Sequence, residues 1–387
     1  MKHTHKFQRS ALMAAVLAAA AVGAQAQSGG SNVRIYGVLD VGVSTFSRSA
    51  TMDKRLTKMN TDTNSSSIWG LTGTEDLGGG LAAQFGFEGG LDPKSGGEGG
   101  IASTGAQAKP TTSAVWNRGS WVGLKSDTWG SLRLGRDYTT HILSQLVNGT
   151  PMPDVAINSS NANMFVAQGI DNDFRNSNMI RYTSPSFAGF DVGVNYILGE
   201  QPGDSSAGRG IGGVVNYTYA PFKVALSYTK NNGVNDPTLG ALGNHANDDV
   251  HYWILTGSYD VGKYRLAFLY DKVSNKNKIP YGWLDSKAWL IGGNYAFTPE
   301  LRVGLQYSEI NASDDAVAGT PYKKKSKYAV ITAHYSLSKR TYLFSTFGHA
   351  DNGIAPIQPL WGGSQGGQQA VKGDSINGFV VGMVHRF

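Results

Sequence analysis

Neither cysteine nor a high density of charge is present in this chain of 387 residues. The absence of cysteine excludes disulfide bonds, thiolate nucleophiles and cysteine-ligated metal centres. Charged residues make up only 16% of the chain, against about 25% in a typical soluble globular protein. The 34 basic and 28 acidic residues nearly balance, so we expect no binding to nucleic acid. A charge-rich soluble fold and a disulfide-stapled fold are therefore both disfavoured.

Long apolar runs are also lacking, except near the N-terminus. There, three basic residues precede an apolar stretch at 11–22, which is followed by the small-x-small sequence Ala24-Gln25-Ala26. This order is typical of a secretory signal peptide, so we predict that residues 1–26 form the signal and that residues 27–387 form one mature domain. No later stretch approaches the ~20 apolar residues that a membrane helix needs. The mature domain is therefore expected to be either soluble or a membrane-spanning β-barrel.

What the chain has instead is glycine, at 51 of 387 positions, and a repeated alternation of apolar and polar residues. Val33 and Ile35 alternate with Arg34 and Tyr36, and the stretch 301–309 shows the same pattern. A period of two is the period of a β-strand, whose side chains point to opposite faces. In a closed barrel, one of these faces meets lipid and the other lines water.

The connections between these stretches alternate in length. The short ones fall at 76–80, 127–130, 220–222, 261–263, 298–300 and 338–340. The long ones fall at 47–64, 92–115, 139–174, 200–209, 232–248, 275–285, 311–326 and 351–373. Short turns at one end and long loops at the other are typical of outer-membrane barrels, with the turns in the periplasm. We therefore predict an all-β fold, a transmembrane antiparallel β-barrel of about 16 strands, with both termini on the periplasmic side.

Aromatic residues gather beside the short turns and at the C-terminus, with Trp129, Phe222 and Tyr264 as examples. Rings with a polar edge favour the lipid–water interface, so this clustering predicts an aromatic girdle, although aromatic residues also favour strands in general. The last stretch, from Phe379 to Phe387, alternates again and stops on an aromatic residue. We expect it to close the barrel against the first strand, since an open sheet edge in lipid is costly. We expect Phe387 itself to matter for insertion by the barrel-assembly machinery.

Five stretches, in order along the chain, are similar to one known family. They are Arg34–Asp40, Trp69–Gly80, Gly135–Thr139, Asn176–Phe187 and Met383–Phe387. Through them the mature chain resembles the Gram-negative porins of the β-proteobacterial type. The resemblance implies a homotrimer in the outer membrane, embedded in lipid and lipopolysaccharide, with a long third loop, at 139–174 in this chain, folded into the lumen. It also implies a water-filled channel for passive diffusion of ions and small hydrophilic solutes, with a weak selectivity for anions.

General porins of this kind oppose arginines on the barrel wall to acidic residues on the inserted loop, and the field between them filters ions. The resemblance carries Arg136 and Arg175 over as arginines of the pore constriction, and Asp154 is the candidate acid on the loop. Arg181 has the same strand parity as Arg175, so both are expected to face water. The parity of Arg136 points outward, but this residue lies where a strand gives way to a loop. For Arg118, parity favours the rim, and a place in the pore stays open.

Two positions depart from the family pattern. Ile68 stands where the family usually has arginine, and Thr72 stands where it has lysine or arginine. The apolar Trp69 and Leu71 should face lipid, which places Ile68 and Thr72 in the lumen at the constriction. Losing two cations there predicts a weaker anion preference than the family norm. The apolar Ile68 also leaves open a channel that prefers small organic solutes such as aromatic or carboxylic acids.

Short enzyme motifs are present, but in unsuitable places. The stretch 257–263 is similar to a phosphate loop and 208–213 to a dinucleotide-binding loop, yet both lead into expected strands rather than helices. The stretch 362–366 matches a nucleophile elbow, but no helix signal follows it. We therefore expect no enzymatic activity, no cofactor and no metal site. A barrel enzyme of the outer membrane and a secreted adhesin are the alternatives from other classes.

Overall fold

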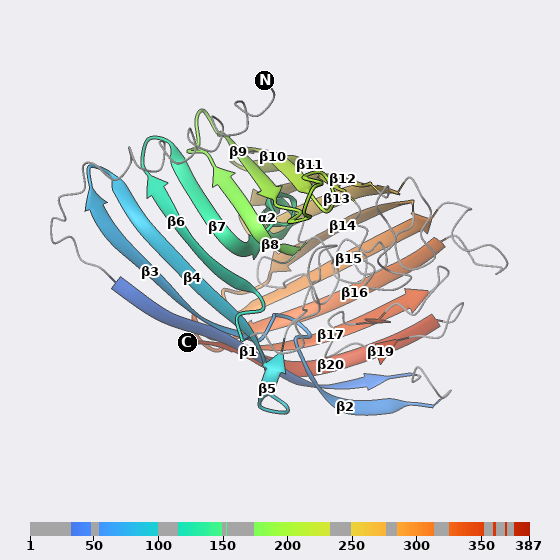
Figure 1. Cartoon of the computed structure of the whole chain (residues 1–387). Coiled ribbons are helices and arrows are strands. Elements are labelled where there is room, and N and C mark those ends of the chain that lie inside the picture. The colour runs from blue at the N-terminus through green and yellow to red at the C-terminus, as the bar shows by residue number, and fades with distance from the viewer. Residues whose placement is uncertain are drawn as a thin grey trace, which may run out of the picture.

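An antiparallel sheet closes on itself to form a β-barrel in the computed structural model of the chain (Figure 1). The structure describes residues 32–47, 54–99, 115–148, 152, 174–232, 249–275, 285–312, 325–351, 359–360, 368–369 and 375–387. The predicted signal peptide at 1–26 and the candidate acid Asp154 lie outside these residues. Short turns join most neighbouring strands at one end of the barrel, as the sequence predicts.

The strands are β1 (Asn32–Phe46), β2 (Leu56–Thr61), β3 (Ile68–Gly78), β4 (Leu81–Asp92), β5 (Gly97–Gly99), β6 (Gly119–Ser126), β7 (Gly130–Tyr138), β8 (Arg175–Thr183), β9 (Phe190–Ile197), β10 (Gly210–Tyr219), β11 (Phe222–Asn231), β12 (Val250–Val261), β13 (Tyr264–Asn275), β14 (Ser286–Ala296), β15 (Leu301–Ala312), β16 (Lys325–Ser336), β17 (Thr341–Asp351), β18 (Pro359–Leu360), β19 (Gln368–Gln369) and β20 (Ser375–Arg386). The helix is α2 (Thr140–Asn148). Among the residues that the structure describes, no helix is long and apolar enough to span a bilayer.

The barrel has 16 strands although its sheet contains 18 segments. The difference arises because β2 and β3 lie one after the other beside β1, and β5 and β6 lie one after the other beside β4. The predicted 16-stranded barrel is therefore confirmed. One expected loop, 47–64, is wrong in part, because Leu56–Thr61 pairs with β1 as β2.

The seam of the barrel joins the first strand to the last. β1 pairs with β20 from Val38 to Phe46, and beyond this ladder Gly37 and Phe387 exchange two backbone hydrogen bonds of 3.2 and 3.1 Å. A Cβ at Gly37 would lie 2.2 Å from the ring of Phe387, so glycine leaves the space into which the terminal ring packs. The closure predicted for the last stretch is thus confirmed, with the C-terminal residue as part of it.

Outward rings pair across neighbouring strands beside the short turns. The ring centroids of Phe190 and Tyr217 are 4.4 Å apart, those of Phe222 and Tyr259 are 4.8 Å apart, and those of Tyr264 and Tyr295 are 4.6 Å apart. Several of these rings are exposed on the outer face, where a lipid–water interface would meet them. This arrangement agrees with the predicted girdle.

The inner face of the barrel is not polar throughout, which strand alternation alone does not predict. A buried apolar cluster covers the inward side of β12 to β17 and of β20. Ile254, Leu269, Leu290 and Phe344 belong to it, and each is at most 3% exposed. Since their outward neighbours on the same strands are also apolar, these strands are apolar on both faces at these positions. Toward the loop end this part of the inner wall is packed, whereas Thr256 and His334 are buried polar residues nearer the short turns.

The described parts of the loop 139–174 lie inside the barrel. α2 packs against β9 to β13, and Figure 1 shows it within the ring of strands. Its first residue, Thr140, donates from its backbone N–H and its hydroxyl to Oδ1 of Asn195, at 3.0 and 2.7 Å. Further along, Met152 reaches β15, where a Cβ at Gly304 would lie 2.7 Å from its sulfur. The predicted inward course of the third long loop is therefore observed where the loop is described.

Candidate channel constriction

Glu88 of β4 is the centre of a polar network on the luminal side of the wall. The guanidinium Nε of Arg118 lies 2.7 Å from its Oε1, and the hydroxyl of Tyr36 donates to its Oε2 at 2.9 Å. Arg118 is only 5% exposed and Glu88 is half-buried, so this ion pair is largely shielded from bulk water. Charge-assisted hydrogen bonds of this kind hold both side chains in one geometry.

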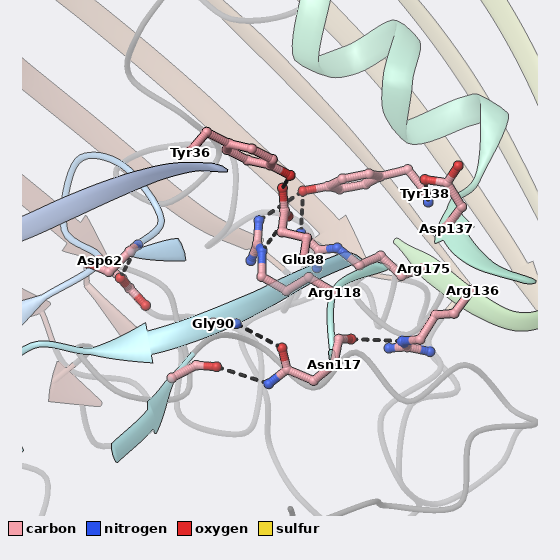
Figure 2. A network of polar contacts seen from close by, with 12 residues as sticks. Tyr36, Asp62, Glu88, Gly90, Asn117, Arg118, Arg136, Asp137, Tyr138 and Arg175 are labelled. Atoms are coloured by element: carbon pink, nitrogen blue, oxygen red, sulfur yellow. Dashed lines mark hydrogen bonds and ion pairs between the residues drawn. The ribbon is translucent and has the colours of Figure 1, made fainter. Parts of the chain in front are cut away.

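Tyr138 connects a second arginine to the network. Its hydroxyl accepts hydrogen bonds from Nη2 of Arg118 at 2.8 Å and from Nη2 of Arg175 at 2.5 Å. The Arg175 guanidinium also lies over the Tyr138 ring, 4.2 Å from its centroid. In Figure 2, Tyr36, Arg118, Tyr138 and Arg175 converge on Glu88. The network therefore holds two guanidinium groups and one carboxylate, with Arg118 alone in direct contact with Glu88, and this leaves an excess of positive charge.

The strand register explains why these side chains meet. Tyr36 pairs with Gly70, and Gly70 pairs with Glu88, so the three positions form one row on the same face. A Cβ at Gly70 would lie 2.6 Å from the Tyr36 ring. The absence of a side chain at this position therefore lets the tyrosine lie across β3 and reach the carboxylate.

A second ionic group lies on β7 and β8. Asp137 accepts from Arg133 at 3.1 Å and from Arg181 at 2.9 Å, and these two arginines are directly opposite each other in the register. The Arg133 guanidinium stacks on the inward ring of Trp121, 3.7 Å from its centroid. Again a glycine provides the space, because a Cβ at Gly86 would lie 2.6 Å from the Trp121 indole. This group too contains two cations for one acid.

The arginines singled out from the sequence lie in different surroundings. Arg175 belongs to the network around Tyr138, and Arg181 to the group around Asp137. Arg136 pairs with Ser120 in the register, and its guanidinium donates to the Asn117 carbonyl at 2.7 Å and to the Ser177 hydroxyl at 3.2 Å. In the view of Figure 2 it lies across the β4 ribbon from Glu88.

The two uncharged positions lie on β3. Ile68 pairs with Val38 and Thr72 pairs with Arg34, in the rows on either side of the Tyr36–Gly70 pair. Positions two apart on a strand share a face, so Ile68 and Thr72 face the same way as Gly70. The candidate acid Asp154 lies outside the described residues, so its distance from these groups stays open.

Glu88, Tyr36 and Tyr138 were not singled out as site residues from the sequence. Glu88 carried a signal, because it has the parity of Gln84, opposite the apolar Phe85 and Phe87. For Arg118, the alternation pattern of the sequence was misleading. This residue precedes β6, in a turn that joins the strand at Gly119, so strand parity does not apply to it.

The group also lacks the features of a metal centre. Among the described residues, no three or more His, Asp or Glu side chains are grouped so that they could hold a metal ion. The contacts of the group are an ion pair and hydrogen bonds, so the arrangement offers fixed charges and hydrogen-bond donors.

Known proteins similar to this chain are porins. The family model for the Gram-negative porins matches residues 12–355. Outer membrane porin protein 32 of Delftia acidovorans is 31% identical over 394 residues, which cover 98% of this chain and 100% of that protein. An outer membrane porin protein of Bordetella pertussis is 28% identical over 305 residues, which cover 73% of this chain and 72% of the relative. Among solved structures, the anion-selective porin from Comamonas acidovorans is 26% identical, with a TM-score of 0.71 and coverage of 92% of this chain and 100% of that one.

Proposed function

Because the chain belongs to the Gram-negative porin family and is an outer-membrane β-barrel, we propose that it forms a passive channel for ions and small hydrophilic solutes with a weak preference for anions. The observation that carries this sign is a network with two guanidinium groups and one carboxylate: Arg118 pairs directly with Glu88, and Arg175 joins them through the Tyr138 hydroxyl. Excess positive charge along a narrow wet passage lowers the energy of a passing anion and raises that of a cation. A relative described as anion-selective supports the same sign.

We assign Arg175 and Arg181 to the basic side of the constriction. Arg136 contributes its charge from behind the wall, where it is bound to Asn117 and Ser177. Asp154 supplies negative charge from the inserted loop. Ile68 and Thr72 complete the wall without charge, which makes the anion preference weaker than the family norm.

A second candidate, a channel that prefers small organic acids, is favoured by one observation. Ile68 lies beside Val38 in the register, so two apolar side chains adjoin the arginines of the constriction. The arginines would bind the carboxylate of such a solute, and the two apolar side chains would contact its apolar part. Aromatic carboxylates are the solutes that this version of the function predicts.

Single-channel recording in planar bilayers under a salt gradient tests the proposed function. The reversal potential of the wild-type channel should have the sign of anion preference, and Arg175→Ala should move it toward cations. Lys263→Ala is the matched control, because it removes one positive charge from an exposed turn between β12 and β13. A cation-preferring wild type, or equal shifts in the two variants, would contradict the assignment.

We propose that the protein assembles as a homotrimer in contact with outer-membrane lipid and lipopolysaccharide. A trimer form is described for the outer membrane protein OmpT of Vibrio cholerae, which shares the fold with a TM-score of 0.64. An outward aromatic cluster of Trp69, Phe87 and Trp116 offers an apolar surface for such contact. An unheated sample should migrate far above the monomer on a denaturing gel and fall to it on boiling, whereas a monomer under both conditions would refute the trimer.

A further inference from the structure

The segment 62–67, between β2 and β3, turns into the barrel instead of continuing along the wall. It is anchored by the buried carboxylate of Asp40, which accepts the backbone N–H groups of Asn64 and Ser65, each at 2.6 Å, and the Thr63 hydroxyl at 3.2 Å. Nearly all of these residues are buried. So many bonds to one carboxylate hold the segment in a single course.

Asn64 connects this segment to another part of the barrel wall. Its amide nitrogen lies 2.8 Å from Nε2 of His334 on β16, although β1, β20 and β17 separate β16 from β2 and β3 along the wall. This hydrogen bond joins the segment to the imidazole of His334, which lies beneath it.

Two arginines surround this ring near the short-turn end of the barrel. Arg302 is directly opposite His334 in the pairing of β15 with β16, and the Arg386 guanidinium lies 5.4 Å from the centroid of Tyr342. Tyr342 in turn stacks on His334, with centroids 4.7 Å apart and planes at 22°. The charges of both arginines act on His334. The cluster thus joins two cations, two aromatic rings and the Asn64 amide.

Arg302 differs from the neighbouring Arg265 in its partners. Arg265 is paired with the carboxylate of Asp260, with Nη1 2.9 Å from each oxygen. Arg302 donates to the uncharged Oδ1 of Asn294 at 2.7 Å, and among the described residues no carboxylate is paired with it. Its side chain is only partly buried. A guanidinium with this exposure retains donors that match a planar carboxylate.

We propose that Arg302 and Arg386, roofed by the segment 62–67, form a second anion-binding site between the constriction and the periplasmic mouth, and that it takes small organic carboxylates. The guanidinium groups bind the carboxylate, while the buried, stacked rings of Tyr342 and His334 hold the two arginines in place beside each other. An anion that leaves the constriction then binds at a second site before it reaches the periplasm. This site rests on the proposed channel function and adds a binding step to it.

Block of the ion current by succinate tests the site. Succinate added on the periplasmic side should reduce the wild-type current at lower concentration than succinate added on the loop side. Arg302→Ala with Arg386→Ala should raise the half-blocking concentration from the periplasmic side by about fivefold or more, as expected from the loss of charges close to the ligand. Arg340→Ala is the matched control, because it removes an exposed arginine from the adjoining turn, and it should leave the block unchanged.

A half-blocking concentration equal to that of the wild type in the double variant would overturn the site while leaving the channel function intact. Arg302→Gln alone keeps the test decisive if Arg386→Ala lowers barrel yield, since Arg302 lies outside the closing strand; an unchanged block in this variant would also overturn the site. A reconstituted wild-type barrel that conducts no ions would instead overturn the proposed function, and the site with it.

Discussion

Two halves of the same barrel wall use their inward faces differently. From β3 to β8 most inward side chains are polar, charged or absent, as with Gln84, Glu88 and Arg181, and glycines make room for long side chains that lie along the wall. From β12 to β17 and on β20 the inward side chains toward the loop end are apolar and buried. The first half is suited to a passage for water and ions, and the second to a core.

This difference teaches that a membrane barrel can contain two kinds of interior. The alternation of lipid-facing and water-facing residues holds only where water reaches the inner face. Where α2, Met152 and the segment 62–67 lie against the wall, burial removes apolar area from water, as it does in the core of a soluble protein. At the level of the constriction, the conducting path is therefore expected along β3 to β8.

The seam between the two halves should be the most sensitive point. Deleting Phe387 removes the ring that packs on Gly37 and the two backbone hydrogen bonds at that residue, so the seam loses its last pair while the ladder from Val38 to Phe46 remains. We expect the amount of inserted barrel to fall severalfold, measured by heat-modifiable migration of outer-membrane fractions. Normal insertion with an altered conductance would instead give Phe387 a role in permeation.

The apolar half should govern stability and not selectivity. Leu290→Ala removes an inward, fully buried side chain of β14, and a cavity of this kind costs about 2–5 kcal/mol of unfolding free energy. Ile291→Ala, on the outward face of the same strand, is the control and should cost less, since that side chain leaves no enclosed cavity. Urea titration of refolded barrels measures both. A shifted reversal potential in Leu290→Ala would show that this wall lines the path.

The polar half should govern selectivity, with the smallest free-energy change of the three. Ile68→Arg with Thr72→Lys adds two cations in the rows beside Tyr36, each worth on the order of 1 kcal/mol to an ion about 4 Å away. The anion-to-cation permeability ratio should rise by roughly tenfold or more, since about 1.4 kcal/mol corresponds to a factor of ten. The same variant should lose any preference for benzoate over acetate. An unchanged reversal potential would mean that these positions lie away from the constriction.

Much of the fold could be predicted because its signals are local. Period-two alternation, short turns and the terminal aromatic each depend on a few neighbouring residues, and they led to the strands, the seam and the inward parity of Ile68 and Thr72 relative to Trp69 and Leu71. The apolar half also left a trace, since runs such as Trp253-Ile254-Leu255 do not alternate. A continuous apolar run indicates a strand that is buried on both faces, but it does not identify the residues that cover the inner face.

The candidate site was harder to predict, for a physical reason that Arg118 and Arg136 make plain. The alternation of side chains predicts which face a residue lies on only while the strand pairing is regular. It no longer does so where a strand ends or where a β-bulge shifts the register. Arg118 lies before β6, and the pairing of β7 with β8 shifts between Gly135 and Asp137. One arginine expected near the rim therefore joins Glu88.

By itself the sequence determined the class of fold, the strand pattern and the membership in the porin family, because these depend on composition, period and local motifs. Only the tertiary structure decided which charges meet. The Arg118–Glu88 pair, the shared Tyr138 hydroxyl and the contact of Asn64 with His334 join residues that are 30, 20 and 270 positions apart or more. Such contacts depend on how the ring of strands closes and on where it is interrupted, and neither is encoded in the alternation of any one strand.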